Sequence, residues 1–171
     1  MQRVMLSRCL LGEPARYDGS VYFYEHPVLR RWLAEGRVVS VCPEMAGGLP
    51  VPRPAAEINS ALSPLSLPNG QTSARVVDAT GQDFTLAFVN GAEQIVALAR
   101  QEGIRIAVLK ERSPSCGSSL IYDGSFGSKQ IPGEGIATRR LRQAGIRVFS
   151  EAQLAEADEY LRQLVAVARL G

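Results

Sequence analysis

Three cysteines are the residues best suited to chemistry in this chain of 171 residues. Cys9 and Cys42 each close a short apolar run, and Cys116 lies six residues beyond Lys110, where a third such run ends. Because the carboxyl ends of parallel strands meet at one edge of a sheet, the three thiols are expected in one pocket. The alternative is that each cysteine is a small, buried core residue without chemical function.

Three thiolates suit two kinds of metal centre. Catalytic zinc takes three protein ligands, although three thiolates would leave that site strongly charged. A [4Fe–4S] cluster normally takes four cysteines, so three would leave one iron without a protein ligand and open to a substrate atom. The chain has no Cys-x-x-Cys pair, and its single histidine, His26, is expected to begin a helix. Residue types alone leave both centres, and a domain without metal, open.

The residues that follow Cys42 offer acid–base and binding groups. Glu44 stands two residues after the thiol and is a candidate general acid or base, with a surface or helix-capping carboxylate as the alternative. Gly47 and Gly48 would let the backbone approach a substrate closely, although a plain turn needs the same residues. Arg53 is a candidate for neutralising the charge of the centre or binding a substrate carbonyl, and an ion pair with Glu57 is the alternative.

Hydroxyl and aromatic groups surround the other two cysteines. Ser113 and Ser115 precede Cys116 and are candidates for orienting water or substrate, although serines in such loops are often turn residues. Tyr17 follows the Cys9 segment and is a candidate for stacking on a flat substrate ring, with packing against the first helix as the alternative.

The elements that must position these groups alternate between strands and helices. This alternation predicts a single α/β domain over residues 1–171, with three layers (α/β/α) and a mostly parallel sheet. Residues 43–73 show no periodicity and are expected to form a functional loop. A small hairpin is expected around Tyr122, and Ala74 to Asp78 is expected to add an edge strand. The predicted strands are 3–8, 37–42, 104–110 and 146–149; the predicted helices are 26–35, 82–102, 133–144 and 150–170.

Composition excludes several classes of protein. The net charge is +2 and no basic run occurs, which argues against a nucleic-acid partner. No stretch reaches the roughly 18–20 apolar residues of a membrane-spanning helix, and the apolar run at the N-terminus is too short for the core of a signal peptide. We therefore predict a cytoplasmic protein without a membrane partner, in which an odd number of thiols favours no disulfide framework. The sequence does not specify an oligomeric state.

Three ordered blocks resemble a bacterial family of thiouracil desulfidases that was long labelled a domain of unknown function. The blocks are 7–12 with 16–19, then 42–54, then 109–117; the resemblance covers roughly residues 1–150 and leaves 151–171 as an additional C-terminal helix. Arg8 departs from the small residue expected between Ser7 and Cys9.

The resemblance implies a cofactor, a reaction and a substrate class. It implies a [4Fe–4S] cluster on Cys9, Cys42 and Cys116 with one iron not ligated by protein, and catalytic roles for Glu44 and Ser113. The implied reaction is hydrolytic removal of sulfur from the thiocarbonyl of a thiolated pyrimidine such as thiouracil, present as a small free base or nucleoside, giving the carbonyl and hydrosulfide. A non-catalytic iron–sulfur or sulfide-sensing protein and a zinc hydrolase with three thiolate ligands remain the alternatives.

Overall fold

The computed structural model describes residues 1–59, 65–66, 72–73 and 75–168, and its centre is a parallel sheet of four strands. All three pairs of neighbouring strands are parallel, with Leu6, for example, opposite Ser40 on one side and Val108 on the other. The predicted α/β fold is therefore confirmed. In order across the sheet, the strands are β10 (Arg147–Ser150), β7 (Ile106–Leu109), β1 (Val4–Ser7) and β2 (Val38–Val41).

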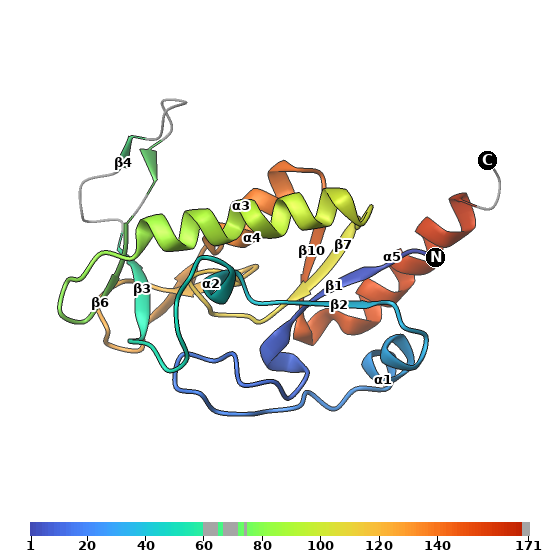
Figure 1. Cartoon of the computed structure of the whole chain (residues 1–171), viewed down its shortest axis with the longest axis horizontal. Coiled ribbons are helices and arrows are strands. Elements are labelled where there is room, and N and C mark those ends of the chain that lie inside the picture. Colours follow the sequence, from blue (N-terminus) through green and yellow to red (C-terminus); the bar gives the residue numbers. More distant parts are fainter. Residues whose placement is uncertain (60–64, 67–71, 74, 169–171) are drawn as a thin grey trace.

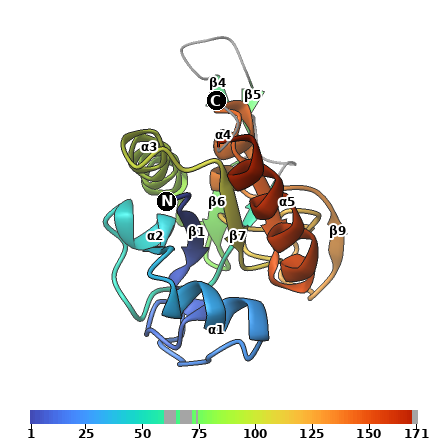
Figure 2. The same ribbon diagram turned by 90° about the vertical axis from the view of Figure 1, so that its right-hand side faces the viewer.

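Helices cover both faces of this sheet (Figures 1 and 2). Two of them, α3 (Thr85–Gln101) and α4 (Ile136–Gln143), pack against one face and against each other. The other two, α1 (Pro27–Ala34) and α5 (Leu154–Val167), cover the opposite face. The three layers and the four helices agree with the prediction from the sequence.

The alternation of side chains along the central strands produces these layers. In β1, Met5 packs with the α3–α4 side, whereas Leu6 packs with α1 and α5. In β7, Ala107 and Val108 divide between the two sides in the same way. All four side chains are fully buried, so both faces of these strands must be apolar, as expected for a parallel sheet between two helical layers.

Two of the predicted helix starts, at His26 and Ser150, are confirmed, whereas α3 and α4 begin at Thr85 and Ile136 instead of at 82 and 133. The side chain of His26 accepts a hydrogen bond from the backbone N–H of Val28, at 3.2 Å, and so caps α1. Ser150 and Gln153 form a reciprocal capping box, which begins with the 3₁₀ turn Glu151–Gln153 and leads into α5.

In its described part, the segment 43–73 is not the structureless loop that its composition predicted, while residues 60–64 and 67–71 lie outside the described residues. It contains the short helix α2 (Pro43–Ala46) and three strands, namely β3 (Ala56–Asn59), β4 (Leu65–Ser66) and β5 (Thr72–Ser73). The expected strand near Asp78 exists as β6 (Arg75–Asp78), but it pairs antiparallel with β3 in a separate sheet instead of joining the edge of the main one. Residue 74 itself lies outside the described residues.

A small apolar core stabilises this second sheet. Ile58 of β3 and Val76 of β6 bury their side chains against Phe88 of α3, which makes a small separate core. The predicted hairpin near Tyr122 is confirmed as β8 (Leu120–Tyr122) paired with β9 (Gln130–Pro132). Among the described helices, none has the length and apolarity needed to cross a membrane.

Candidate active site

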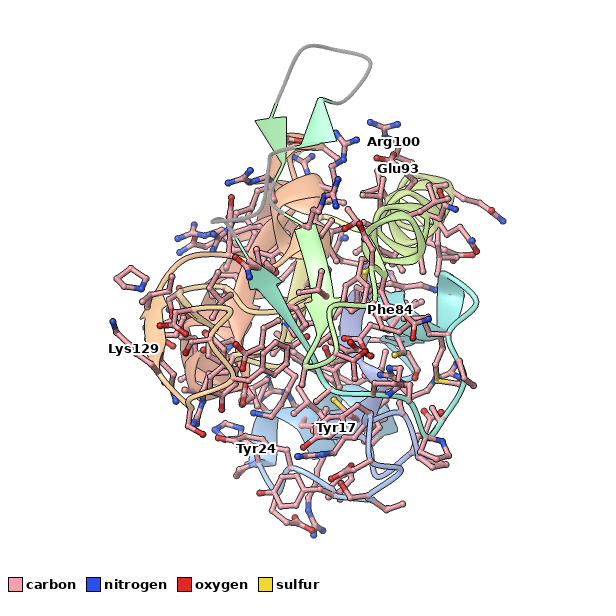
Figure 3. The ribbon with its side chains drawn as sticks, turned by 90° about the vertical axis from the view of Figure 1, so that its left-hand side faces the viewer. Tyr17, Tyr24, Phe84, Glu93, Arg100 and Lys129 are labelled. Carbon is pink, nitrogen blue, oxygen red and sulfur yellow. The ribbon has the colours of Figure 1, made fainter. Side chains whose placement is uncertain are left out.

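A cavity of about 550 Å³ opens at the carboxyl ends of β1, β2 and β7. In Figure 3, Tyr17 lies on the side of the molecule opposite Arg100, which belongs to the last turn of α3. Most of the residues predicted from the sequence meet on the lining of this cavity. They are Cys9, Tyr17, Cys42, Glu44, Arg53, Ser113 and Cys116.

The main sheet places two of the thiols directly. Cys9 lies in the 3₁₀ turn Arg8–Leu10 that follows β1 without a gap. Cys42 follows the last residue of β2 and is the N-cap residue of α2. Its sulfur lies 3.8 Å from the carbonyl oxygen of Ala15, to which the thiol donates a weak hydrogen bond. Because β1 and β2 are neighbours in register, the two thiols leave the same sheet edge side by side.

Cys116 is placed by a loop that folds over the start of α4. The carbonyl oxygens of Pro114 and Ser115 accept hydrogen bonds from the backbone N–H groups of Ile136 and Ala137, both at 2.9 Å. These N–H groups belong to the first turn of the helix, where no partner exists within the helix itself. The start of α4 therefore fixes the backbone on which the third thiol is carried.

Side chains complete the anchoring of this loop. The Ser113 hydroxyl oxygen accepts hydrogen bonds from the backbone N–H groups of Ser115 and Cys116, both at 3.1 Å. The Thr138 hydroxyl donates to the carbonyl oxygen of Cys116 at 2.9 Å. Since Ser113 uses its oxygen only as an acceptor in these bonds, its proton remains available to a group in the cavity.

Glu111 holds the far side of the same loop. One carboxylate oxygen accepts the backbone N–H groups of Ser118, Ser119 and Leu120, and the other accepts the hydroxyls of Ser118 and Ser119. Partial burial raises the pKa of Glu111, but these hydrogen bonds outweigh it and lower the pKa to about 2. The carboxylate is therefore ionised at neutral pH and accepts five hydrogen bonds from the loop.

The three thiols share a poorly solvated environment. Burial, reinforced by the nearby Cys42, raises the pKa of Cys9 to about 11, while Lys110 and Arg16 oppose that shift. Burial likewise raises the pKa of Cys42. It raises that of Cys116 strongly, and the other two thiols add to the effect. The thiol of Cys42 therefore disfavours the ionisation of Cys9 and Cys116, so ligation of all three needs a positively charged group between them.

This donor set suits an iron–sulfur cluster. Thiolates are the ligands that such clusters take, and each of three thiolates in a cluster binds a different iron. Among the side chains that the structure describes, no group of three or more His, Cys, Asp or Glu residues is arranged to hold a single metal ion.

Glu44 and Arg53 form a buried ion pair on the cavity wall. The Nε and Nη2 atoms of Arg53 both lie 2.6 Å from Oε2 of Glu44, and the two side chains are only 5% and 13% exposed. Arg53 also donates to the carbonyl oxygens of Ala15 and Pro50. The ion pair with Glu57 that the sequence left open is not formed, because Arg53 turns to Glu44 instead. Within the described chain Oε1 of Glu44 receives no protein donor, so it is free to face a water or a substrate.

Three of the predicted substrate contacts lie outside the cavity lining. Gly47 packs against α3, where an added Cβ would lie 2.0 Å from the carbonyl oxygen of Ala87. Gly91 of α3 meets α2 as closely, since a Cβ there would lie 1.8 Å from the carbonyl oxygen of Pro43. Gly48 follows in a left-handed turn with a φ of 92°, and Ser115 is buried with its hydroxyl unpaired. We therefore leave Gly47, Gly48 and Ser115 out of the proposed substrate contacts.

Sequence reasoning missed several residues that line or support this site. Glu57 and Phe126 line the cavity but lie outside the three sequence blocks around the cysteines, whereas Glu111 lies within the third block, where the sequence assigns it no role. A signal existed for Glu111, because it follows the third strand directly, at the edge where sites form. Phe126 is an apolar ring within a segment of glycines, serines and charged residues, which is also unusual for a surface turn.

Comparisons with known proteins agree on one family. A family model described as 2-thiouracil desulfurase matches residues 4–153. The uncharacterised protein YbbK of Bacillus subtilis (strain 168) is 40% identical over 151 residues, which cover 88% of this chain and 97% of that protein. The solved structure of TudS, a [4Fe-4S]-dependent thiouracil desulfidase, superposes with a TM-score of 0.85 at 44% identity. This match covers 95% of this chain and 99% of that one.

Proposed function

Because the chain belongs to the 2-thiouracil desulfurase family, we propose that it removes the sulfur of a thiolated pyrimidine with the help of a [4Fe–4S] cluster. In this reaction water replaces sulfur, so the thiocarbonyl becomes a carbonyl and the sulfur leaves as hydrosulfide without a net transfer of electrons. The observation that carries the proposal is that two thiols from neighbouring strand ends and a third from the loop after β7 line one cavity together with Glu44 and Ser113.

Cys9, Cys42 and Cys116 are the residues that would hold the cluster. Three thiolates would leave one iron without a protein ligand, and this iron would supply Lewis-acid chemistry to the sulfur of the substrate. Lys110 and Arg16 are the cations that favour ionisation of Cys9, and they suit a centre that gathers three thiolates.

Glu44 is the proposed acid–base residue. Arg53 binds one of its oxygens and fixes the carboxylate, which leaves the other oxygen to orient the attacking water. A group held this way needs little reorganisation when the reaction begins. Arg53 thus acts by positioning Glu44, since its own donors are taken by that carboxylate and by two backbone carbonyls.

Ser113 and Tyr17 complete the proposed site. The Ser113 hydroxyl is fixed by two backbone N–H groups and keeps its proton to donate to the developing oxygen or to water. Tyr17 lines the cavity with 45% of its surface exposed, so its ring is accessible to a flat substrate. A cavity of about 550 Å³ accepts a free base or a nucleoside.

The test is turnover of 2-thiouracil by protein that has been reconstituted without oxygen. We expect uracil and hydrosulfide in equal amounts over many turnovers, with about four irons and four acid-labile sulfides per chain. Cys42→Ala should lose the iron. Glu44→Gln should keep the iron and lose turnover by roughly 100-fold or more, as expected for a general acid or base.

Two results would contradict the proposal. Full iron content without turnover of any thiolated pyrimidine would indicate a non-catalytic iron–sulfur or sulfide-binding protein. One zinc per chain in place of iron would indicate the hydrolase alternative. Near-normal turnover by Glu44→Gln would remove only the role of Glu44.

A further inference from the structure

The β8–β9 hairpin carries an aromatic ring to the cavity. Phe126, at the tip of this hairpin, lines the cavity and is half-buried, whereas Ser125 and Gly127 on either side of it are exposed. Its ring belongs to none of the three apolar clusters found among the described residues. Core packing therefore does not account for a phenylalanine at this position.

The tip of the hairpin is docked onto β3. Glu57, which is 9% exposed, accepts hydrogen bonds from the backbone N–H groups of Gly124 and Phe126 at 2.9 and 3.1 Å. At Gly124 an added Cβ would lie 2.9 Å from the Cα of Asn59, so only glycine permits this close approach. A buried carboxylate and a glycine contact together fix the position from which the ring of Phe126 enters the cavity.

The backbone at Phe126 has an unusual conformation. Within the described chain, the non-glycine residues with positive φ are Arg112, Phe126 and Ser128, at 66°, 58° and 59°. All three line the cavity. For a bulky residue such as phenylalanine this region is costly, and glycine would adopt it freely. A strained aromatic residue held at a cavity wall indicates a function for its ring.

The chemistry of the ring indicates what it binds. Tyr17 and Tyr122 also line the cavity, so the walls offer several aromatic faces. Aromatic side chains bind flat heterocycles by stacking on them, because every such ring has a π-face to offer. We infer that Phe126 is a specificity-determining residue that stacks on the pyrimidine ring and restricts the site to flat, cyclic thiocarbonyl compounds. This inference rests on the proposed function and names the group that recognises its substrate.

The experiment compares Phe126→Leu, which removes the π-face, with Phe126→Tyr, which keeps it. Reconstituted proteins are assayed with 2-thiouracil, and binding of uracil, which has no sulfur to lose, is measured by calorimetry. Phe126→Leu should raise the KM for 2-thiouracil and the Kd for uracil by roughly tenfold, with kcat and iron content unchanged. In Phe126→Tyr, which keeps the π-face, the KM and the Kd should stay within about twofold of the wild-type values.

Two further variants test the docking of the hairpin. Gly124→Ala should weaken binding of uracil in the same direction as Phe126→Leu, because it separates the tip from β3. Lys129→Ala is the matched control on the same hairpin, since Lys129 extends away from the molecule and its side chain is 72% exposed (Figure 3). It should leave KM and Kd unchanged.

The outcomes separate this inference from the proposed function. Unchanged KM and Kd in Phe126→Leu at full iron content would overturn the inference and leave the desulfidase activity standing. Loss of iron in Phe126→Leu would also overturn it, because the ring would then serve the structure. A wild-type protein that binds uracil through Phe126 but does not turn over 2-thiouracil would overturn only the proposed function.

Discussion

The Cys42 turn and the Cys116 loop hold their thiols in opposite ways. Behind Cys42, α2 packs against α3 through Gly47 and Gly91, which touch the backbone of the facing helix. Around Cys116, Glu111, Ser113 and Thr138 hold the chain by hydrogen bonds. The packing behind Cys42 leaves no room for a side chain at either glycine. The Cys116 loop instead depends on hydrogen-bonding side chains, one of which is a charged carboxylate. The two sides of one site should therefore fail under different changes.

Gly91→Ala should have the largest effect and should act on the Cys42 side. The new methyl group would overlap the carbonyl of Pro43, so α2 must move away from α3. Overpacking of this kind costs about 3 kcal/mol of unfolding free energy, measured by urea denaturation. Asn90→Ala, at the exposed neighbouring position, is the control and should change stability little. An equally stable Gly91→Ala protein would show that the contact between the two helices is not tight.

Glu111→Ala should have the next largest effect and should act on the Cys116 side. It removes the acceptor of three backbone N–H groups and two hydroxyls, at a cost of about 2 kcal/mol. Glu111→Gln keeps one acceptor oxygen, so its unfolding free energy should fall by less than half as much as that of Glu111→Ala. Urea denaturation gives the stability, and iron content after reconstitution shows whether the loop still presents Cys116. Equal stability of the two variants would contradict the role of the carboxylate oxygens.

The same carboxylate predicts a contribution to the pH dependence of stability that Glu111→Gln should remove. The pKa of Glu111 is lowered to about 2 in the folded protein, against the ordinary value of 4.5. Its contribution to stability is thus complete above pH 4.5 and is lost as the pH falls towards 2. Allowing for solvent screening, we expect a loss of about 1–2 kcal/mol that is absent in Glu111→Gln. Unfolding curves of both cluster-free proteins across this pH range provide the measurement, and parallel curves would contradict the prediction.

Thr138→Val should have the smallest effect. Valine keeps the shape of threonine but removes the hydroxyl that donates to the carbonyl oxygen of Cys116. Loss of this single buried bond costs about 1 kcal/mol of unfolding free energy, which thermal denaturation resolves. Thr138→Ser, which keeps the hydroxyl, serves as the comparison and should retain more of the stability than valine does.

The sequence predicts the layers and most of the site because both depend on local patterns. Apolar runs that end at Cys9 and Cys42 predict two of the strands. Because sites form at the carboxyl ends of parallel strands, the same runs predict that the thiols lie close together. Arg53 was identified as part of the site, but its partner was not. Whether Arg53 forms its ion pair with Glu44 or with Glu57 depends on how the chain folds around α2. That ion pair is a tertiary contact, which local sequence patterns do not predict.

The error over residues 43–73 has a similar cause. Strand β3 has only four residues and pairs with β6 across the intervening segment, so no local periodicity marks it. Its stability comes from burial of Ile58 against Phe88, a residue of a distant helix. The sequence also does not predict the contact of Gly47 with α3, because a glycine for helix packing and a glycine for ligand approach look the same in a sequence.

The spacing of the three thiols along the chain also has a consequence for assembly. Cys9 and Cys42 are 33 residues apart, and Cys42 and Cys116 are 74 residues apart. A group bound to all three is a cross-link that closes two long loops, and closure of such loops in the unfolded chain opposes unfolding by about 3–4 kcal/mol per link in the manner of a disulfide. Strand β7 must also pair with β1 before Cys116, which follows β7 in the chain, can lie near Cys9 and Cys42. A chain still emerging from the ribosome therefore has no complete site until residue 116 is free, and binding of the proposed cluster to all three thiols would report that the central sheet has been assembled.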